Sequence, residues 1–420
     1  MLDIAALLVT LTAVFAWLNH KIVRLPSTIG VMGIALVLSM ALVGLGRLGF
    51  TGITQQAERL VASVDFTTVL MQGMLSLLLF AGALHVDLSD LLSRRHAIVT
   101  LATVGVLIST TIVGLAAWVV LGLVGLPMRL IDCFVFGALI SPTDPIAVMG
   151  ILKSAQAPKG LEIKITGESL FNDGVGVVLF AVLLGLAQGT RPMSPGGVAI
   201  LFVEEAAGGI VLGLVLGYLT YLLLRSIDHY QVEILLTLAL VLGGNALATR
   251  LHVSGPLAMV VAGLFIGNQG RLFAMSETTE RHVDTFWELI DEILNAVLFV
   301  LIGLEILTLT FRVERLVASL LMIPAVLFAR FVAVGIPIRL LGRWRRYSPH
   351  AVKILTLAGV RGGISVALAL SLPSGPARQV FVPMTYVIVL FSILVQGLSL
   401  RSLVQRTVGA PTQARLPDEP

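Results

Sequence analysis

Apolar stretches of about 20 residues recur along the whole chain and are separated by short polar connections. A helix of that length crosses the hydrocarbon core of a bilayer, so the pattern predicts an all-α polytopic membrane protein with about 13 transmembrane helices. Hydrophobic residues make up 57% of the chain and charged residues 12%. The expected spans are residues 4–19, 28–45, 66–86, 97–124, 130–152, 162–187, 198–224, 231–249, 254–268, 286–309, 314–341, 350–372 and 380–400.

The connections and the first span bear on processing and on disulfides. No connection is long enough to hold a separate soluble domain. The first apolar segment is followed by His20, Lys21 and Arg24 instead of small residues at a cleavage site, which favours a retained first helix over a signal peptide. The single cysteine, Cys133, excludes an intramolecular disulfide and a multi-cysteine metal site.

Lysine and arginine are distributed unequally between the two sets of connections. One set, together with the C-terminal tail, holds 17 of the 28 basic residues, and the opposite set holds 8. Cytoplasmic connections carry the excess, so we expect a multi-pass protein of the cell (inner) membrane with its N-terminus outside and its C-terminus in the cytoplasm. This asymmetry explains the high isoelectric point. Without basic patches interleaved with aromatic residues, no nucleic acid is expected as a partner.

The fifth span contains the sequence Ser141-Pro-Thr-Asp-Pro145. Each proline removes a backbone donor, so the helix is expected to be interrupted around Thr143 and Asp144. A proline by itself is typical of a structural kink, but an acid between two prolines favours a site. Irregular backbone at membrane depth must line a cavity or pack in protein, and secondary transporters use such breaks to bind cations.

The sixth span contains two acids on different helix faces. At 100° per residue, Ser169 and Asp173 lie about 40° apart and can share one ligand. Glu168 and Asn172 form a second pair on a neighbouring face. Glu168 and Asp173 point about 140° apart, which predicts that Asp173 faces a cavity and that Glu168 faces a partner.

The twelfth span contains Arg361 among Gly359, Gly362 and Gly363. The glycines predict a second break, and a buried arginine requires an anion, for which Glu168 is the predicted partner. Such a pair is either purely structural or takes a direct part in transport. Arg330 has no obvious partner in the sequence.

Two triplets of spans, 4 to 6 and 11 to 13, each have an interrupted helix in the middle. They begin on opposite sides of the membrane, which predicts inverted repeats and two discontinuous crossing helices with the site at the crossing.

Three motifs together resemble the NhaP-type monovalent cation:proton antiporters of the sodium/hydrogen exchanger superfamily. They are Ser141-Pro-Thr-Asp-Pro145, Gly167-Glu-Ser-Leu-Phe-Asn-Asp173 and Gly359-Val-Arg-Gly-Gly363, and the resemblance covers essentially the whole chain. It implies a homodimer in the membrane lipid. The implied units are scaffold and dimerisation helices at 1–96 and 231–309, a transport domain at 97–187 and 314–400, a connector helix at 198–224 and a cytoplasmic tail at 401–420.

The resemblance also implies a role for each matching residue. Asp173 alternately binds the cation and the proton, and the other ligands of the transported monovalent cation are Asp144, Ser169 and the carbonyl of Thr143. Glu168 and Arg361 match a stabilising ion pair. Asn172 stands where the electrogenic branch has a second aspartate, which implies electroneutral exchange of one cation for one proton. No cofactor is implied.

One position departs from the family pattern. Where some relatives place a glutamate ligand in the third span, this chain has Ala81. The site therefore lacks one possible anionic oxygen, which favours weaker cation binding or transport of K⁺ and leaves the choice among Na⁺, K⁺ and Li⁺ open.

The sequence thus predicts a secondary active antiporter and leaves two alternatives. A cation channel would require a filter loop, and no repeated loop is visible. An organic-anion transporter would require Arg361 to be free of Glu168. The sequence has no phosphate-binding loop, dinucleotide fingerprint or nucleophile elbow, so an ATP-driven pump, a hydrolase or any other enzyme is not expected.

Overall fold

The computed structural model describes most of the chain, and all of its regular elements are helices. Within the described residues there is no β-strand. The described residues are 2–49, 73–145, 159–189, 195–307, 312–342 and 351–400, with single residues or pairs at 52, 55–56, 59, 61, 148–149, 152 and 403.

Long helices alternate with short helical segments. The α-helices are α1 (Leu2–Leu18), α2 (Ser27–Arg47), α4 (Leu75–Leu84), α5 (Leu88–Ser93), α6 (Arg95–Thr100), α7 (Val106–Leu123), α8 (Leu130–Ile140), α10 (Lys159–Ala187), α11 (Pro195–Arg225), α12 (Tyr230–Leu251), α13 (Gly255–Phe265), α14 (Arg271–Ala274), α15 (Glu277–Glu305), α16 (Val313–Gly342), α17 (Ala351–Ala358), α18 (Gly363–Leu370) and α19 (Pro376–Phe391). Segments of π-helix extend or join them at η1 (Asn19–Val23), η3 (Leu101–Gly105), η4 (Ile266–Gly270) and η5 (Ser392–Gly397).

Every predicted span overlaps at least one of these helices. Nine described helices are long and apolar enough to cross a membrane, and the bent pair α17 and α18 would be a tenth. The shorter α4 and α8 overlap the third and fifth predicted spans, although part of each span lies outside the described residues. The all-helical membrane fold is therefore confirmed, while the number of 13 crossings stays a prediction.

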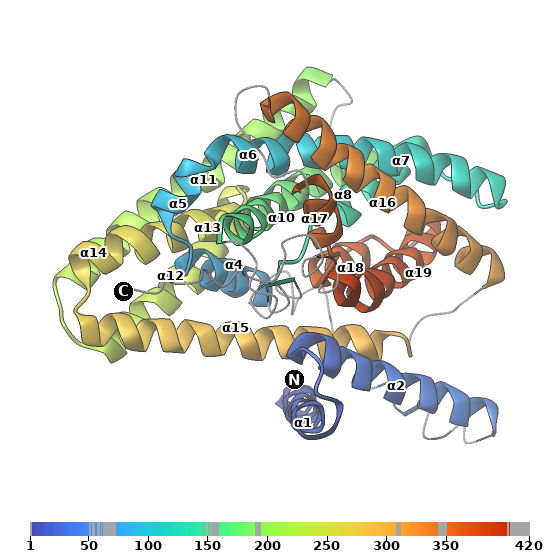
Figure 1. Ribbon diagram of the computed structural model, residues 1–420, viewed down its shortest axis with the longest axis horizontal. Coiled ribbons are helices and arrows are strands. Elements are labelled where there is room, and N and C mark those ends of the chain that lie inside the picture. Colours follow the sequence, from blue (N-terminus) through green and yellow to red (C-terminus); the bar gives the residue numbers. More distant parts are fainter. Residues whose placement is uncertain are drawn as a thin grey trace, which may run out of the picture.

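The tenth span differs from its predicted extent. The helix begins at Glu277, not near residue 286, because Ser276 caps it by accepting a hydrogen bond from the backbone N–H of Thr279. Its polar first half has no helix breaker, so the helix continues directly into the apolar half. Figure 1 shows α15 running along one side of the molecule, with α2 packed against it.

Two helices are interrupted where the sequence predicted breaks. α8 ends at Ile140, and residues 141–145 are not helical. The axes of α17 and α18 differ by 49° across residues 359–362. The backbone N–H of Asp144 donates to the carbonyl of Val360 at 2.7 Å, so the two breaks meet and each satisfies a backbone group of the other.

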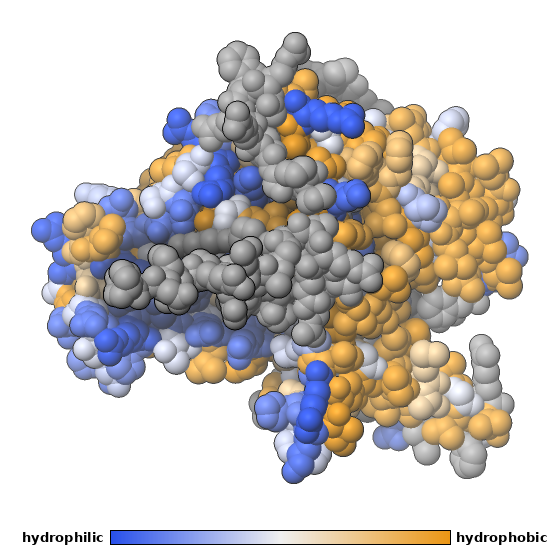
Figure 2. Space-filling view, in the orientation of Figure 1, coloured by the Kyte–Doolittle hydropathy of each residue, from blue (hydrophilic) through white to orange (hydrophobic). Residues whose placement is uncertain are grey.

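The surface separates apolar from polar regions. In Figure 2, hydrophobic residues cover the end of the molecule formed by α2, α7 and α16, while hydrophilic residues gather over α5 and the N-terminal turns of α15. Large apolar side chains such as Trp118 on α7 and Phe328 on α16 are more than half exposed. An apolar surface of this kind is typical of a protein in contact with lipid.

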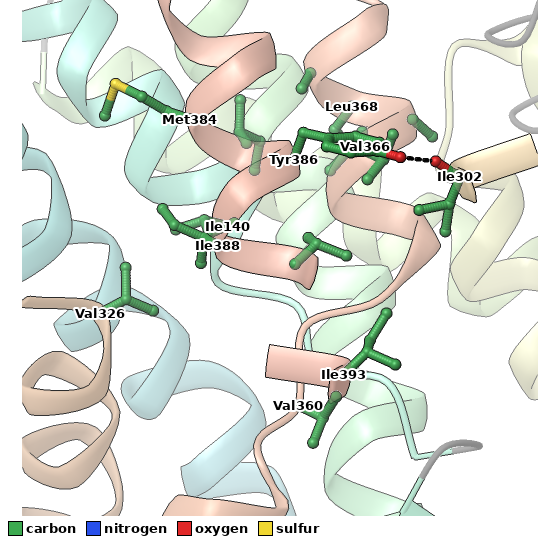
Figure 3. Close-up of a cluster of buried hydrophobic side chains, with 14 of the residues drawn as sticks. Ile140, Ile302, Val326, Val360, Val366, Leu368, Met384, Tyr386, Ile388 and Ile393 are labelled. Carbon is green, nitrogen blue, oxygen red and sulfur yellow. Dashed lines mark hydrogen bonds between the residues drawn. The ribbon is translucent and has the colours of Figure 1, made fainter. Parts of the chain in front are cut away.

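A buried apolar cluster packs around the second break and along α19. Figure 3 shows Val360 and Ile393 near the break and Leu368, Met384 and Tyr386 farther along the helices. The Tyr386 hydroxyl donates to the carbonyl of Ile302, which ties α19 to the end of α15. This cluster forms the core on the side of the breaks where α15 and α18 end and α19 begins.

Candidate functional site

A cavity of about 600 Å³ lies between α4, α10 and α15 and reaches both helix breaks. Asp144 and Asp173 lie on its wall, together with Thr143 at the first break and residues 362–365 at the second. Leu75, Leu79 and Leu170 contribute an apolar wall. The cavity therefore brings two carboxylates and freed backbone together at the place where the interrupted helices meet.

Asp173 projects from α10, and its side chain is buried. The residue is only 4% exposed, and its Oδ1 has no hydrogen-bond partner in the described part of the chain. A buried carboxylate oxygen without a partner is costly, and either a proton or a cation would satisfy it. Asp173 thus has the chemistry expected of a group that exchanges these two ligands.

The first break is stabilised by neutral side chains from α10. Asn172 accepts a hydrogen bond from the Thr143 backbone N–H at 3.3 Å and donates to the Thr143 hydroxyl at 2.7 Å. The Ser169 hydroxyl lies 3.0 Å from the Thr143 hydroxyl. Of the predicted ligands, Ser169 is the one that does not reach the cavity wall in this conformation, and its hydroxyl contacts Thr143 instead.

Asp144 lies very close to the second break. A Cβ atom added to Gly362 would come within 2.2 Å of Asp144 Oδ2, so any side chain at position 362 would displace the carboxylate. This close approach explains why the second break contains glycine at this position. The backbone of the two breaks and the Asp144 carboxylate are therefore packed closely together.

Arg361 is 2% exposed and binds the backbone of the first break. Its Nη1 donates to the carbonyls of Ser141 and Pro142, the latter at 3.1 Å, and its backbone N–H donates to the Ser392 hydroxyl at 2.9 Å. The carbonyls released by the proline-containing break are therefore the acceptors of this guanidinium. Arg361 holds the two breaks together and brings a positive charge near Asp173.

The prediction that Glu168 forms an ion pair with Arg361 is wrong, because Glu168 has a different partner. Glu168 forms a salt bridge with Arg330 of α16, whose Nη2 also donates to the Leu355 carbonyl at 3.1 Å. Arg330 passes directly over Gly359, where an added Cβ would lie 2.3 Å from Nε. Glu168 points away from Asp173 as predicted, but the cation it meets comes from the eleventh span, not the twelfth.

A row of polar residues on α15, not predicted from the sequence, also belongs to the site. Asp284, Glu288, Asp291 and Asn295 all line the cavity. Their spacing places them within about 60° on one helix face, a signal that helical periodicity could have revealed. Asp284 is paired with Arg271, whereas Glu288 and Asp291 have no salt bridge within the described residues. The α15 wall adds negative charge to the cavity.

Ala81 and His85 lie on the α4 wall of the cavity. Ala81 lines the cavity and is fully buried, and its side chain offers no oxygen to the site. His85 Nδ1 lies 2.8 Å from the Ala81 carbonyl. Among the residues that the structure describes, no group of three or more His, Cys, Asp or Glu could hold a resident metal ion.

Comparison with known proteins identifies the family. The family described as sodium/hydrogen exchanger, transmembrane, matches residues 8–406. The chain belongs to the sodium/hydrogen exchanger family. Within this family of transporters, it is 54% identical over 410 residues to the Na⁺/H⁺ antiporter NhaP of Pseudomonas aeruginosa, a match that covers 97% of each chain.

Two further matches span nearly the whole chain of this exchanger-family protein. The Na⁺/H⁺ antiporter NhaH of Halobacillus dabanensis is 34% identical over 395 residues, or 92% of this chain and 93% of that protein. The structure of the sodium proton antiporter MjNhaP1 of Methanocaldococcus jannaschii aligns with a TM-score of 0.75 at 20% identity, covering 96% of this chain and 98% of that chain. The resemblance to NhaP-type antiporters and the fold it implied are confirmed.

Proposed function

We propose that this membrane protein exchanges Na⁺ for H⁺ by alternating access, with the two ions competing for Asp173. The observation that carries the proposal is the Asp173 carboxylate, which has an unpartnered oxygen and lies on the wall of a cavity at two crossing helix breaks. The relatives named Na⁺/H⁺ antiporters support the choice of ions. K⁺ and Li⁺ are the other candidate cations, because Ala81 on the cavity wall offers no oxygen ligand that would select Na⁺.

The proposed ligand set follows from the chemistry of the cavity wall. Asp173 and Asp144 supply carboxylate oxygens, and the Thr143 carbonyl supplies a backbone oxygen at the first break. The Ser169 hydroxyl joins them when its bond to Thr143 opens. Oxygen ligands from carboxylates and broken helices replace the hydration shell of the cation, which offsets the cost of dehydrating it.

The cavity extends from the breaks toward His85, at the predicted cytoplasmic end of α4. We therefore assign this conformation to the inward-facing state. On the opposite side lie the Tyr386–Ile302 hydrogen bond and the apolar cluster of Figure 3, which we assign as the contacts that close the path there. Alternating access requires these contacts to open when the transport domain moves.

The domain arrangement of the exchanger belongs to the same proposal. The moving unit consists of residues 97–187 and 314–400, and the scaffold of residues 1–96 and 231–309, joined by the connector at 198–224. The protein forms a homodimer in the membrane lipid, with its N-terminus outside and the tail at 401–420 in the cytoplasm. The excess of basic residues in one set of connections supports this orientation.

Exchange is expected to be electroneutral. Asn172, next to Asp173, is a neutral amide that binds Thr143 through both its oxygen and its nitrogen, and an amide adds no titrating charge. One carboxylate then carries one cation or one proton in each cycle. In proteoliposomes, a membrane potential imposed with valinomycin at fixed ion gradients should leave the initial rate unchanged. A rate that follows the potential would contradict a one-for-one cycle.

Competition at Asp173 predicts a specific dependence on pH, and its measurement tests the proposed function. Protonated Asp173 does not bind the cation, so the apparent KM for Na⁺ should rise about tenfold for each pH unit below the pH at which the site titrates. Above that pH, proton supply limits the rate. The profile at fixed Na⁺ is therefore bell-shaped, and its acid limb should move to lower pH as Na⁺ increases.

The measurement is dye-monitored proton flux over a grid of pH and cation concentration, with equal pH on both sides before each pulse. Parallel pulses of Na⁺, K⁺ and Li⁺ identify the cation. An acid limb that stays fixed at every cation concentration would argue against competition at one carboxylate and would direct attention to His85.

The alternative functions are not favoured. An organic anion would have to reach Arg361, but Arg361 is buried, lies outside the cavity wall and binds the Ser141 and Pro142 carbonyls. The relatives named antiporters also give no support to a channel.

A further inference from the structure

We infer that Asn295 of α15 is a further ligand of the transported cation. This inference rests on the proposed function, because it concerns the cation that is exchanged at Asp173. The proposed ligands described above come from the first helix break and α10, whereas Asn295 belongs to the proposed scaffold. The observations that carry it are the burial of Asn295, its orientation and its place on the cavity wall.

Asn295 is a buried polar residue whose hydrogen bonds are incomplete. It is 2% exposed, and its Nδ2 donates to the Asp291 carbonyl at 2.8 Å. The group facing a carbonyl must be the amide nitrogen, because a carbonyl only accepts, so the side-chain oxygen is the atom left over. This Oδ1 has no partner among the described residues. Buried amide oxygens are normally satisfied, and a cation would satisfy this one.

Asn295 lies at the level of the two helix breaks. It lines the same cavity as Asp144 and Asp173. One turn farther along α15, Leu298 contacts the first residue of α18, since a Cβ on Gly363 would lie 2.5 Å from its side chain. One turn earlier, Asp291 is close enough to interact electrostatically with Asp144. The amide therefore lies on the α15 wall of the cavity that also holds the two carboxylates of the site.

The chemistry of the amide suits a monovalent cation. Hard cations are bound by carboxylate, backbone carbonyl and amide oxygens, and an amide oxygen adds a ligand without adding charge. A neutral ligand at this place leaves the exchange of one positive charge for another unaltered. It also sets the geometry of the site, and therefore the choice among cations of different radius. Asn295 is in this sense a specificity-determining residue.

The α15 wall places Asn295 at the inner end of a polar row. Asp284, Glu288 and Asp291 precede it on the same face and lead from the predicted cytoplasmic end of the helix into the cavity. A cation that enters along this row reaches Asn295 at its inner end. The apolar residue Leu298 follows directly and ends the row.

The test distinguishes the effect of losing the Asn295 side-chain oxygen from the effect of losing its N–H donor. Asn295→Leu removes both, while Asn295→Asp keeps the oxygens and loses the donor to Asp291. We expect Asn295→Leu to raise the KM for Na⁺ about fivefold or more, with the maximal rate unchanged, as for the loss of one polar contact. Asn295→Asp should keep the wild-type KM or lower it at alkaline pH. Flux is measured in proteoliposomes with Na⁺, K⁺ and Li⁺ in turn.

Ser76→Ala is the matched control. Ser76 is a buried residue of α4 whose hydroxyl also has no partner in the described part of the chain, but it does not line the cavity. Its KM should not change. If Asn295→Leu does not fold, Asn295→Ala replaces it, and stabilisation by Na⁺ in detergent replaces flux, since a ligand that binds the native state raises Tm. The shift in Tm with Na⁺ should then be smaller than in the wild type and in Ser76→Ala.

An unchanged KM or Tm shift in the variants without the oxygen would overturn the inference. Equal losses in Asn295→Leu and Asn295→Asp would also overturn it, because they would assign the effect to the donor and hence to structure. Failure of the proposed function is distinguished by Asp173→Asn. If that variant still exchanges, the site itself is misplaced, whereas an inactive Asp173→Asn with a normal Asn295→Leu rejects Asn295 alone.

Discussion

Asp173→Asn is expected to abolish cation-coupled proton flux while the protein stays folded. The substitution keeps the size of the side chain and removes the charge for which both ions compete. Asp173 is buried and its Oδ1 has no partner within the described residues, so a neutral amide removes a costly buried charge. The melting temperature without cation should therefore be unchanged or higher.

Two measurements check this expectation. Dye-monitored proton flux in proteoliposomes should show no response to a Na⁺ pulse, and stabilisation by Na⁺ in detergent should be lost, because the native state no longer binds the cation. Asp132→Asn is the matched control, since Asp132 stands in the first turn of α8 and pairs with Arg129 at 2.7 Å, away from the cavity. Flux that persists in Asp173→Asn would reject the assignment.

The helices and both breaks could be predicted because each depends on local chemistry. In lipid, backbone polar groups must hydrogen-bond within the protein, so the membrane spans are helices with apolar side chains. Stretches of apolar residues can be recognised directly in the sequence. Pro142 and Pro145 remove backbone donors, and the glycines around Arg361 permit the close approach seen between Gly362 and Asp144. The facing of Asp173 and Glu168 in different directions also follows from helix geometry alone.

The polar half of α15 could not be placed by hydropathy. Acids at this depth are unfavourable in lipid, so the predicted span began at residue 286, which left out Asp284 and gave no reason for Glu288 and Asp291 inside it. In the fold, Asp284, Glu288 and Asp291 face a cavity instead of lipid. Whether a polar helix face meets water or lipid depends on its neighbours α4 and α10, which are distant in sequence, and no local pattern reports this.

The partner of Glu168 could not be read from the sequence for a related reason. Two buried arginines, Arg330 and Arg361, were available, and periodicity gives directions on one helix but not distances between helices. The acceptors of Arg361 turned out to be the Ser141 and Pro142 carbonyls. The prolines that break the helix thus also create the groups that bind this arginine, which leaves Glu168 to Arg330.

The ion pair between Glu168 and Arg330 predicts the largest effect on stability. Its two side chains are 1% and 8% exposed, so removing either one leaves an uncompensated buried charge. Glu168→Gln and Arg330→Gln should each destabilise the protein by about 3–5 kcal/mol, whereas the double variant should recover much of the loss. The measurement is thermal unfolding in detergent, read as a double-mutant cycle.

A second cycle, with Glu168→Gln and Arg361→Gln, provides the comparison. Arg361 is buried as deeply, and its charge also interacts with Glu168, but its hydrogen bonds go to backbone carbonyls and not to the carboxylate. The coupling free energy in this cycle should therefore be clearly smaller than in the Arg330 cycle. A coupling with Arg361 as large as that with Arg330 would mean that both arginines share the carboxylate. A coupling with Arg361 alone would restore the pairing expected from the sequence.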